Sequence, residues 1–134
     1  MKSKNTIEYT KKEFFPVFDT IKKCIKEDRF QIELNENRQE NIDFINEFNL
    51  RQKRIKEILS DIKIDDFCYA TRDIKNRDVI LYVFSPNATV YNCDDVILKI
   101  QMYIKFRIIH TTVPETLITI SFHKLNERIS FAFK

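Results

Sequence analysis

The sequence contains no glycine, and this absence limits both the turns the chain can make and the sites it can build. Glycine supplies backbone conformations with positive φ and allows a backbone to approach a phosphate closely. A Walker A loop, a dinucleotide-binding turn and a hydrolase nucleophile elbow each require glycine, so their standard forms are excluded. The turns must instead use asparagine, aspartate and the three prolines.

The composition is that of a folded globular chain. Hydrophobic residues make up 43% and aromatic residues 13% of the 134 residues, which is enough for a buried core. We expect one domain over residues 1–134. The longest apolar run, Val79–Phe84, is far too short to span a membrane, and the charged N-terminus does not resemble a secretory signal. A cytoplasmic protein without a membrane partner is expected.

The cysteines and histidines lie too far apart in sequence to predict a disulfide framework or a metal site. Cys24, Cys68 and Cys93 contain no C-x-x-C spacing, and neither His110 nor His123 has another such ligand nearby. An odd number of cysteines fits a reducing compartment. We expect no metal and no cofactor. The net charge of +3 is small, so the distribution of charge along the chain matters more.

The spacing of apolar residues changes from helical to strand-like between Asp61 and Phe67. Helices are predicted from about Phe15, after Asn37 and after Asn49, because each asparagine precedes a Glu or Gln by three residues. A helical part over about 14–62 followed by a sheet over about 77–134 predicts an α+β fold, with N-terminal helices packed on a mostly antiparallel sheet. Extended stretches are expected at 30–34, 77–84, 89–91, 96–109, 116–123 and 129–133, with turns at 85–87, 92–95 and 110–115.

The predicted strand 96–109 alternates with unusual regularity between apolar and polar residues. Such alternation places one set on the core side of a sheet and the other set on the opposite side. The core set is Ile100, Met102, Ile104, Phe106 and Ile108, and the other set is Lys99, Gln101, Tyr103, Lys105 and Arg107. In the next strand the expected core set is Ile118, Ile120 and Phe122, and the outward set is Thr119, Ser121 and His123.

Pairing of these two strands predicts a polar patch. If Ile109 and Thr116 flank the turn, Lys105 lies opposite about Ser121, and residues opposite each other share a face. The same register places Tyr103 opposite about His123. The patch is expected to contain Tyr103, Lys105, Arg107 and His123, with Lys124 and Arg128 close behind.

These residue types suit phosphodiester chemistry. Lysine and arginine neutralise a phosphate and the additional charge of its transition state. Tyrosine donates to a phosphate oxygen, and histidine exchanges a proton with a sugar hydroxyl near neutral pH. RNA supplies its own nucleophile, the 2′-hydroxyl, so no metal is required. The alternative interpretation is an ordinary solvated sheet face, in which His123 makes a structural hydrogen bond.

Several short segments resemble a known family in their order and composition. They are Leu59-x6-Asp66-Phe67, Leu81-Tyr82-Val83-Phe84, Tyr103-Ile104-Lys105-Phe106 and Ile120-Ser121-Phe122-His123. Over residues 12–134 the chain resembles the motility quorum-sensing regulator family of type II toxin–antitoxin systems, in particular its longer relatives. The segments 41–45 and 54–59 also look similar to this group.

The resemblance implies a RelE-like fold and a metal-independent endoribonuclease that cleaves mRNA and is held inactive by a cognate antitoxin protein. The strand tyrosine of the family falls on Tyr103, the basic residue two positions later on Lys105, and the catalytic basic position near the C-terminus on His123. With Arg107 these residues form the expected catalytic set. The residues expected to contact RNA are Arg77, Tyr82, Lys124 and Arg128.

The chain departs from the family pattern at two catalytic positions. Tyr69 falls near the family's lysine and Val83 near its glutamine, while Tyr82 and Ser85 replace a tryptophan and a glycine. One interpretation is a remodelled site in which Arg72, Lys75 or Arg77 supplies the missing charge.

Two other functions stay open from the sequence. One is a catalytically inactive RNA- or protein-binding inhibitor on the same scaffold. The other is an interaction domain without any nucleic-acid role, because Asp65, Asp66, Asp94 and Asp95 dilute the basic surface.

Overall fold

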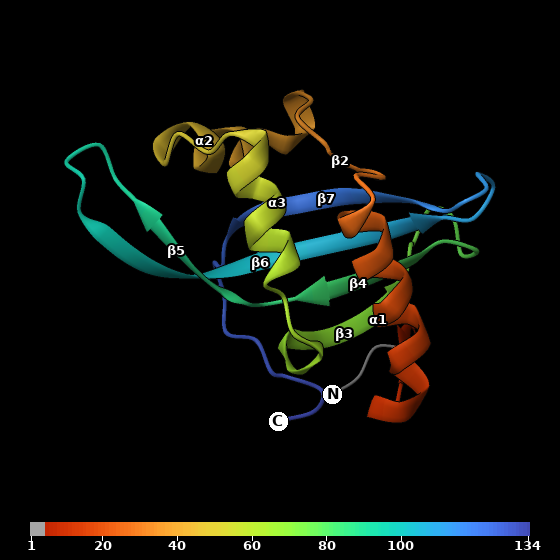
Figure 1. The fold of residues 1–134 in the computed structure, drawn as a ribbon. Coiled ribbons are helices and arrows are strands. Elements are labelled where there is room, and N and C mark those ends of the chain that lie inside the picture. The colour runs from red at the N-terminus through yellow and green to blue at the C-terminus, as the bar shows by residue number, and fades with distance from the viewer. Residues whose placement is uncertain (1–4) are drawn as a thin grey trace.

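The computed structural model describes residues 5–134 and has an α+β fold, as the sequence predicts. Two helices, α1 and α3, lie across one face of a seven-stranded sheet, and α2 lies beyond its β2 edge (Figure 1). We call the face under the helices the inner face and the opposite face the outer face. The elements are β1 (Thr6–Ile7), α1 (Lys11–Lys26), β2 (Phe30–Ile32), a 3-10 turn η1 (Glu36–Arg38), α2 (Gln39–Glu47), α3 (Gln52–Ser60), a second 3-10 turn η2 (Ile64–Asp66), β3 (Phe67–Arg72), β4 (Ile80–Phe84), β5 (Asn87–Tyr91), β6 (Ile97–Ile109) and β7 (Thr116–Lys124).

Asparagine and aspartate take the place of glycine at the helix ends, as expected. Asp28 (φ 60°) follows α1 and Asn49 (φ 47°) follows α2, both in the left-handed region. The next residue then donates back into the helix: Arg29 N–H to the Cys24 carbonyl at 2.8 Å, and Leu50 N–H to Ile45 at 2.9 Å. Both ends are therefore Schellman motifs built without glycine.

The helices expected after Asn37 and Asn49 form there, but the predicted caps of both helices and the start of the first helix are wrong. The first helix begins at Lys11 rather than near Phe15, because Thr10 and Glu13 form a capping box. Asn37 does not cap α2, since Asn35 caps the preceding 3-10 turn by accepting from the Asn37 backbone N–H. Asn49 ends α2 instead of opening α3, which starts at Gln52 without a side-chain cap.

The sheet has the strand order β1-β3-β4-β6-β7-β2, and every pair is antiparallel except β2 with β7. The predicted extended stretch at 30–34 is thus a strand, at the edge of the sheet beside β7. The strand β3 (Phe67–Arg72) lies outside the predicted sheet limits of 77–134. The prediction missed it because its short sequence has no clear alternation and directly follows the helical part. No strand forms at 129–133 within the described residues; this segment crosses to β3, where Ala132 N–H donates to the Phe67 carbonyl.

The predicted turn at 85–87 is a bend within a continuing strand. Strands β4 and β5 pair in succession with β6, from Leu81 opposite Arg107 to Tyr91 opposite Ile97. Ser85 holds the bend, because its hydroxyl donates to the Met102 carbonyl at 2.6 Å. Beyond the bend, β5 and the start of β6 form the long hairpin that projects from the body in Figure 1.

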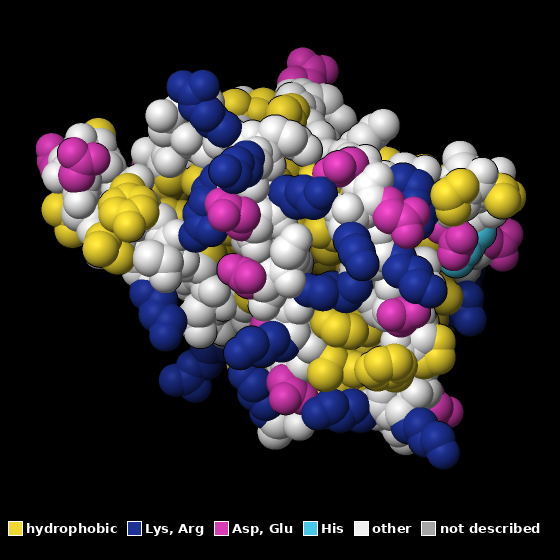
Figure 2. Space-filling view, viewed as in Figure 1, with side chains coloured by type: hydrophobic (Ala, Val, Ile, Leu, Met, Phe, Trp, Pro, Cys, Tyr) yellow, Lys and Arg dark blue, Asp and Glu magenta, His cyan; other side chains and the backbone are white. Residues whose placement is uncertain are grey.

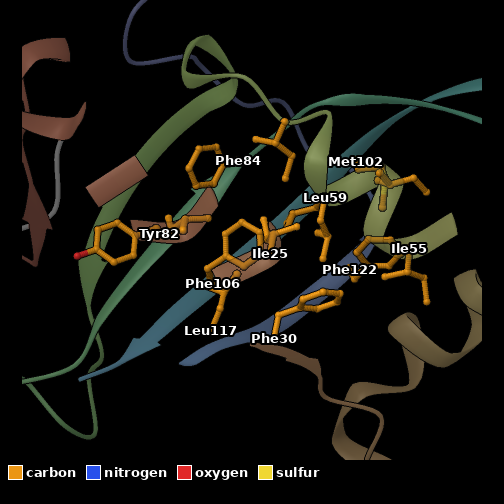
Figure 3. Close-up of a cluster of buried hydrophobic side chains, with 14 of the residues drawn as sticks. Ile25, Phe30, Ile55, Leu59, Tyr82, Phe84, Met102, Phe106, Leu117 and Phe122 are labelled. Carbon is orange, nitrogen blue, oxygen red and sulfur yellow. The ribbon is translucent and has the colours of Figure 1, made fainter. Parts of the chain in front are cut away.

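Aromatic and aliphatic side chains together fill the core between the helices and the inner face (Figure 3). Phe14 stacks on Phe67 with ring centroids 3.8 Å apart, and Phe84 packs edge-on against Phe106 at 5.6 Å. Tyr82 belongs to this cluster and is only 5% exposed. Burial of large apolar side chains stabilises such a core by about 25 cal/mol per Å² removed from water.

A β-bulge in the β6–β7 pair changes which side chains of β7 face the core. Lys105 is opposite Ser121, but the next residue, Phe106, is opposite Thr119, so Ile120 is the extra residue. Before the bulge the alternation is inverted relative to the prediction: Thr119 is buried on the inner face and Ile118 shares the outer face with Arg107. The expected positions of these two side chains are therefore wrong.

Asn41 of α2 supports the bulge from the side. Its side-chain amide donates to the carbonyls of Glu33 and Ile120, both at 2.9 Å, and its oxygen accepts from Phe122 N–H at 2.8 Å. The Asn41 side chain thus hydrogen-bonds to the backbone of β7 where β2 has ended, and Asn41 is only 1% exposed.

Candidate functional site

The outer face carries a hollow of about 420 Å³ where β3, β6 and β7 meet the segment after β7. The predicted register is confirmed here, because Tyr103 lies opposite His123 and Lys105 opposite Ser121. We call this cavity the His123 hollow. Its lining includes Arg38, Glu40, Tyr69, Tyr103, Lys105, Ser121, His123 and Arg128.

Two tyrosines and a histidine form a row across the hollow. The rings of Tyr103 and His123 are nearly parallel, with centroids 5.6 Å apart and an interplanar angle of 21°. On the other side, the hydroxyls of Tyr103 and Tyr69 are 3.2 Å apart. Burial and the hydrogen bond to Tyr69 raise the pKa of Tyr103, so its phenol keeps its proton and can donate.

A backbone hydrogen bond sets the orientation of the His123 ring. Nδ1 lies 2.8 Å from the carbonyl oxygen of Lys124, which only accepts, so Nδ1 carries the proton in the neutral ring. The Nε2 atom then has a lone pair for a substrate proton. Glu40 Oε2 lies 3.7 Å from Nδ1 and accepts from the side-chain amide of Asn126 at 2.7 Å, so a carboxylate stands beside the imidazole.

Lys105 contributes a half-buried ammonium group to the hollow. Burial, followed by the nearby Arg38 guanidinium, lowers the pKa of its ammonium. Within residues 5–134 its Nζ atom has neither a hydrogen-bond partner nor an ion-pair partner. A half-buried ammonium without a partner is suited to bind an anion from outside.

Two arginines, Arg38 and Arg128, also line the hollow. Arg38 lies in η1, 29 residues before β3 begins and in no periodic pattern, and its Nε is 3.3 Å from the Glu33 carboxylate. Arg128 comes from the segment that crosses from β7 to β3. Phe133 anchors that segment by packing against Phe14 and Phe67, with centroids about 6 Å apart. Arg128 was expected near RNA, but no sequence signal indicated Arg38.

The structure separates the other predicted residues from the hollow. Arg107 lies on the same face of β6 but lines a neighbouring cavity. Tyr82 is opposite Phe106 on the inner face and buried, so it cannot contact RNA at the outer face. Lys124 is opposite Met102, which places its side chain toward the inner side. Arg77 lies in the loop before β4, where it bonds to the Asn5 side chain at 2.6 Å.

The residues proposed to replace the missing family lysine are also outside the hollow. Arg72 donates to the Arg77 carbonyl in the same loop, and Lys75 is an exposed residue of that loop. The position near that lysine, Tyr69, does lie in the hollow. The positive charge there comes instead from Arg38 and Arg128.

The basic residues of α3 are part of a mixed surface on the helical side. Arg54 lies 3.7 Å from Glu57, and Lys56 lies 2.7 Å from Asp28. Figure 2 shows Lys and Arg side chains interspersed with Asp and Glu over this face. Charges of alternating sign in solvent are typical of an ordinary surface rather than of a polyanion site.

The chain matches no protein-family model and no curated protein. Among residues 5–134, no helix is long and apolar enough to cross a membrane. In the same part of the chain, no three His, Cys, Asp or Glu side chains are grouped as a metal ion would need.

Proposed function

We propose that the protein is a metal-independent endoribonuclease that cleaves mRNA in the cytoplasm, acting as the toxin of a type II toxin–antitoxin system. The observation that carries the proposal is that Tyr103, Lys105 and His123 line one hollow of the outer face. These are the three positions at which the chain resembles the catalytic residues of the motility quorum-sensing regulator family. Helices that precede a mostly antiparallel sheet are also compatible with a RelE-like fold.

The geometry suggests a role for each side chain in the reaction. His123 Nε2 takes the proton from a ribose 2′-hydroxyl, whose oxygen attacks the adjacent phosphorus. The bond from phosphorus to the 5′-oxygen of the next nucleotide breaks, and that oxygen leaves as an alcohol after taking a proton from solvent. The products are a 2′,3′-cyclic phosphate and a 5′-hydroxyl end.

The cations and the phenol act on the phosphate oxygens. Lys105, together with Arg38 and Arg128 of the same hollow, neutralises the extra negative charge of the pentacovalent transition state. The Tyr103 phenol, which keeps its proton, donates to a non-bridging oxygen. Arg38 and Arg128 supply the positive charge that the family places on the residue matched by Tyr69. A cognate antitoxin is proposed to cover the hollow.

A second candidate is a protein that binds RNA through this hollow without cutting it. The observation in its favour is the pair of phenols at 3.2 Å, because Tyr69 stands where the resemblance expects a catalytic lysine. In this case the hollow keeps its affinity for phosphate but lacks one catalytic group. The two candidates differ in whether the RNA bound by the protein becomes shorter.

The test is incubation of the purified protein with an mRNA transcript in excess EDTA. We expect fragments that end in a 2′,3′-cyclic phosphate, detected by mass spectrometry. An oligonucleotide with a single 2′-deoxyribose at the cut position should resist cleavage, because it lacks the nucleophile. Binding with no cleavage at any protein concentration would support the second candidate, and neither binding nor cleavage would reject both.

A further inference from the structure

The outer face has a second cavity, of about 450 Å³, directly beside the His123 hollow. We call it the Arg107 hollow. Arg107 of β6 lines it, and so do Leu81 of β4 and Ile118 of β7. Arg38 lines both cavities, which makes them adjoining parts of one surface.

We propose that the Arg107 hollow binds the nucleotide next to the one cleaved, so that single-stranded RNA runs across both cavities with Arg38 between two successive phosphates. This inference rests on the proposed function, because it assigns the cleaved phosphate to the His123 hollow.

The spacing of the cations supports a polynucleotide track. Lys105 and Arg107 are two residues apart on one face of β6, which separates their Cα atoms by about 6.8 Å. This spacing is comparable to the separation of neighbouring phosphates in an extended strand. Lys105 lines the His123 hollow and Arg107 lines the Arg107 hollow, while Arg38 lines both. A guanidinium shared between two sites can contact two phosphates through its fork of donors.

The floor of the Arg107 hollow suits a base that is not paired. Aliphatic side chains of three strands form it, including Leu81, Ile109 and Ile118. An unstacked base can lie flat on such a surface, whereas the bases of a duplex are stacked away from it. The β7 bulge creates this floor, because it turns Ile118 to the outer face beside Arg107.

Carboxylates at the rim indicate which bases fit. Asp73 and Glu33 both line the cavity, and Glu33 is held by Arg38 at 3.3 Å. A carboxylate accepts hydrogen bonds from an exocyclic amino group, as on adenine or cytosine, and repels the carbonyl oxygens of uracil. The cavity should therefore favour adenine or cytosine over uracil.

Binding of a fluorescein-labelled, single-stranded 2′-O-methyl RNA tests the inference without any chemistry, because this probe cannot be cleaved. Anisotropy is measured over a range of KCl concentrations for the wild type, Arg107→Gln and Arg38→Gln. We expect each variant to bind roughly tenfold more weakly at low salt and to lower the slope of log K against log[KCl] by about 0.7. The matched control is Arg51→Gln, an exposed arginine before α3 without a side-chain cap bond.

Two outcomes overturn the inference. If Arg107→Gln binds the probe with the same affinity and the same salt slope as Arg51→Gln, then no phosphate lies in the Arg107 hollow. Equal affinity of the wild type for oligoadenylate, oligocytidylate and oligouridylate probes would reject the base assignment. Thermal melts of the variants confirm that the fold is intact.

The failure of the proposed function gives a different result. If the wild type binds the probe and Arg107→Gln reduces binding, but natural RNA stays intact, the track stands and the nuclease is rejected. If RNA is cleaved and Arg107→Gln changes neither binding nor cleavage, the nuclease stands and the track is rejected.

Discussion

Tyr103 and His123 lie directly opposite each other on β6 and β7, with their rings 5.6 Å apart and nearly parallel. Residues in this relationship project from the same face of a sheet, so the phenol and the imidazole share one cavity. Lys105, two residues along β6, enters the same cavity. A single strand pair thus supplies the three groups on which the proposed chemistry depends.

Lys105 should reduce the stability of the fold while it serves the site. Burial and the nearby Arg38 lower the pKa of the Lys105 ammonium in the folded protein. At pH values between the pKa of Lys105 in the folded chain and its pKa in the unfolded chain, the unfolded chain binds more protons, so the stability of the fold rises with pH. Below that window the buried charge is unfavourable. We expect Lys105→Met to be more stable than the wild type at neutral pH, with the difference shrinking at alkaline pH.

Urea unfolding at neutral pH and at about pH 10 measures this difference. Lys53→Met, which removes an exposed lysine of α3, is the matched control and should leave stability unchanged. A Lys105→Met protein that is less stable than the wild type at neutral pH would show that the ammonium stabilises the fold.

Asn41 should be essential for the stability of the β7 edge. Its replacement by alanine leaves the Phe122 N–H and two carbonyls without their partner in a buried place, which costs about 2–4 kcal/mol of unfolding free energy. Chemical denaturation of Asn41→Ala gives the value. Asn46→Ala, an exposed asparagine of the same helix, should change stability by less than about 0.5 kcal/mol. Similar losses in both variants would contradict the role assigned to Asn41.

The three cysteines should differ sharply in reactivity. Cys93 is exposed at the tip of the β5–β6 hairpin, whereas Cys24 and Cys68 are buried. Burial raises the pKa of the Cys68 thiol to about 12, so almost no thiolate is present at neutral pH. An aromatic disulfide reagent should rapidly modify only the Cys93 thiol in the folded protein, and all three thiols when the protein is unfolded in urea. Rapid modification of a Cys93→Ser variant would mean that a buried thiol is accessible.

The register of β6 and β7 could be predicted because the strict alternation from Leu98 to Ile108 and a short turn leave little freedom. The bulge at Ile120 could not, because Ile118 and Ile120 are apolar whether they face the core or the outer cavity. This one inserted residue reversed the expected positions of Ile118 and Thr119 and created the Arg107 hollow. The α+β order of elements followed from the change of apolar period alone.

The composition of the site depends on contacts between distant segments, which a periodic pattern does not encode. Arg38 reaches the His123 hollow because Asn41 and β2 hold the start of α2 beside β7. Arg128 does so because Phe133 fixes the C-terminal segment in the core. Tyr82 was assigned to RNA from its motif position, but its alternation with Val83 places it on the inner face.

The most direct measurement compares RNA cleavage by His123→Gln and Lys124→Gln, adjacent residues of β7 on opposite faces of the sheet. The account predicts that the wild type cleaves in EDTA, that His123→Gln loses about 10²- to 10⁴-fold in rate, and that Lys124→Gln stays close to the wild type. Equal rates for the His123→Gln variant and the wild type, or no cleavage by the wild type, would contradict it.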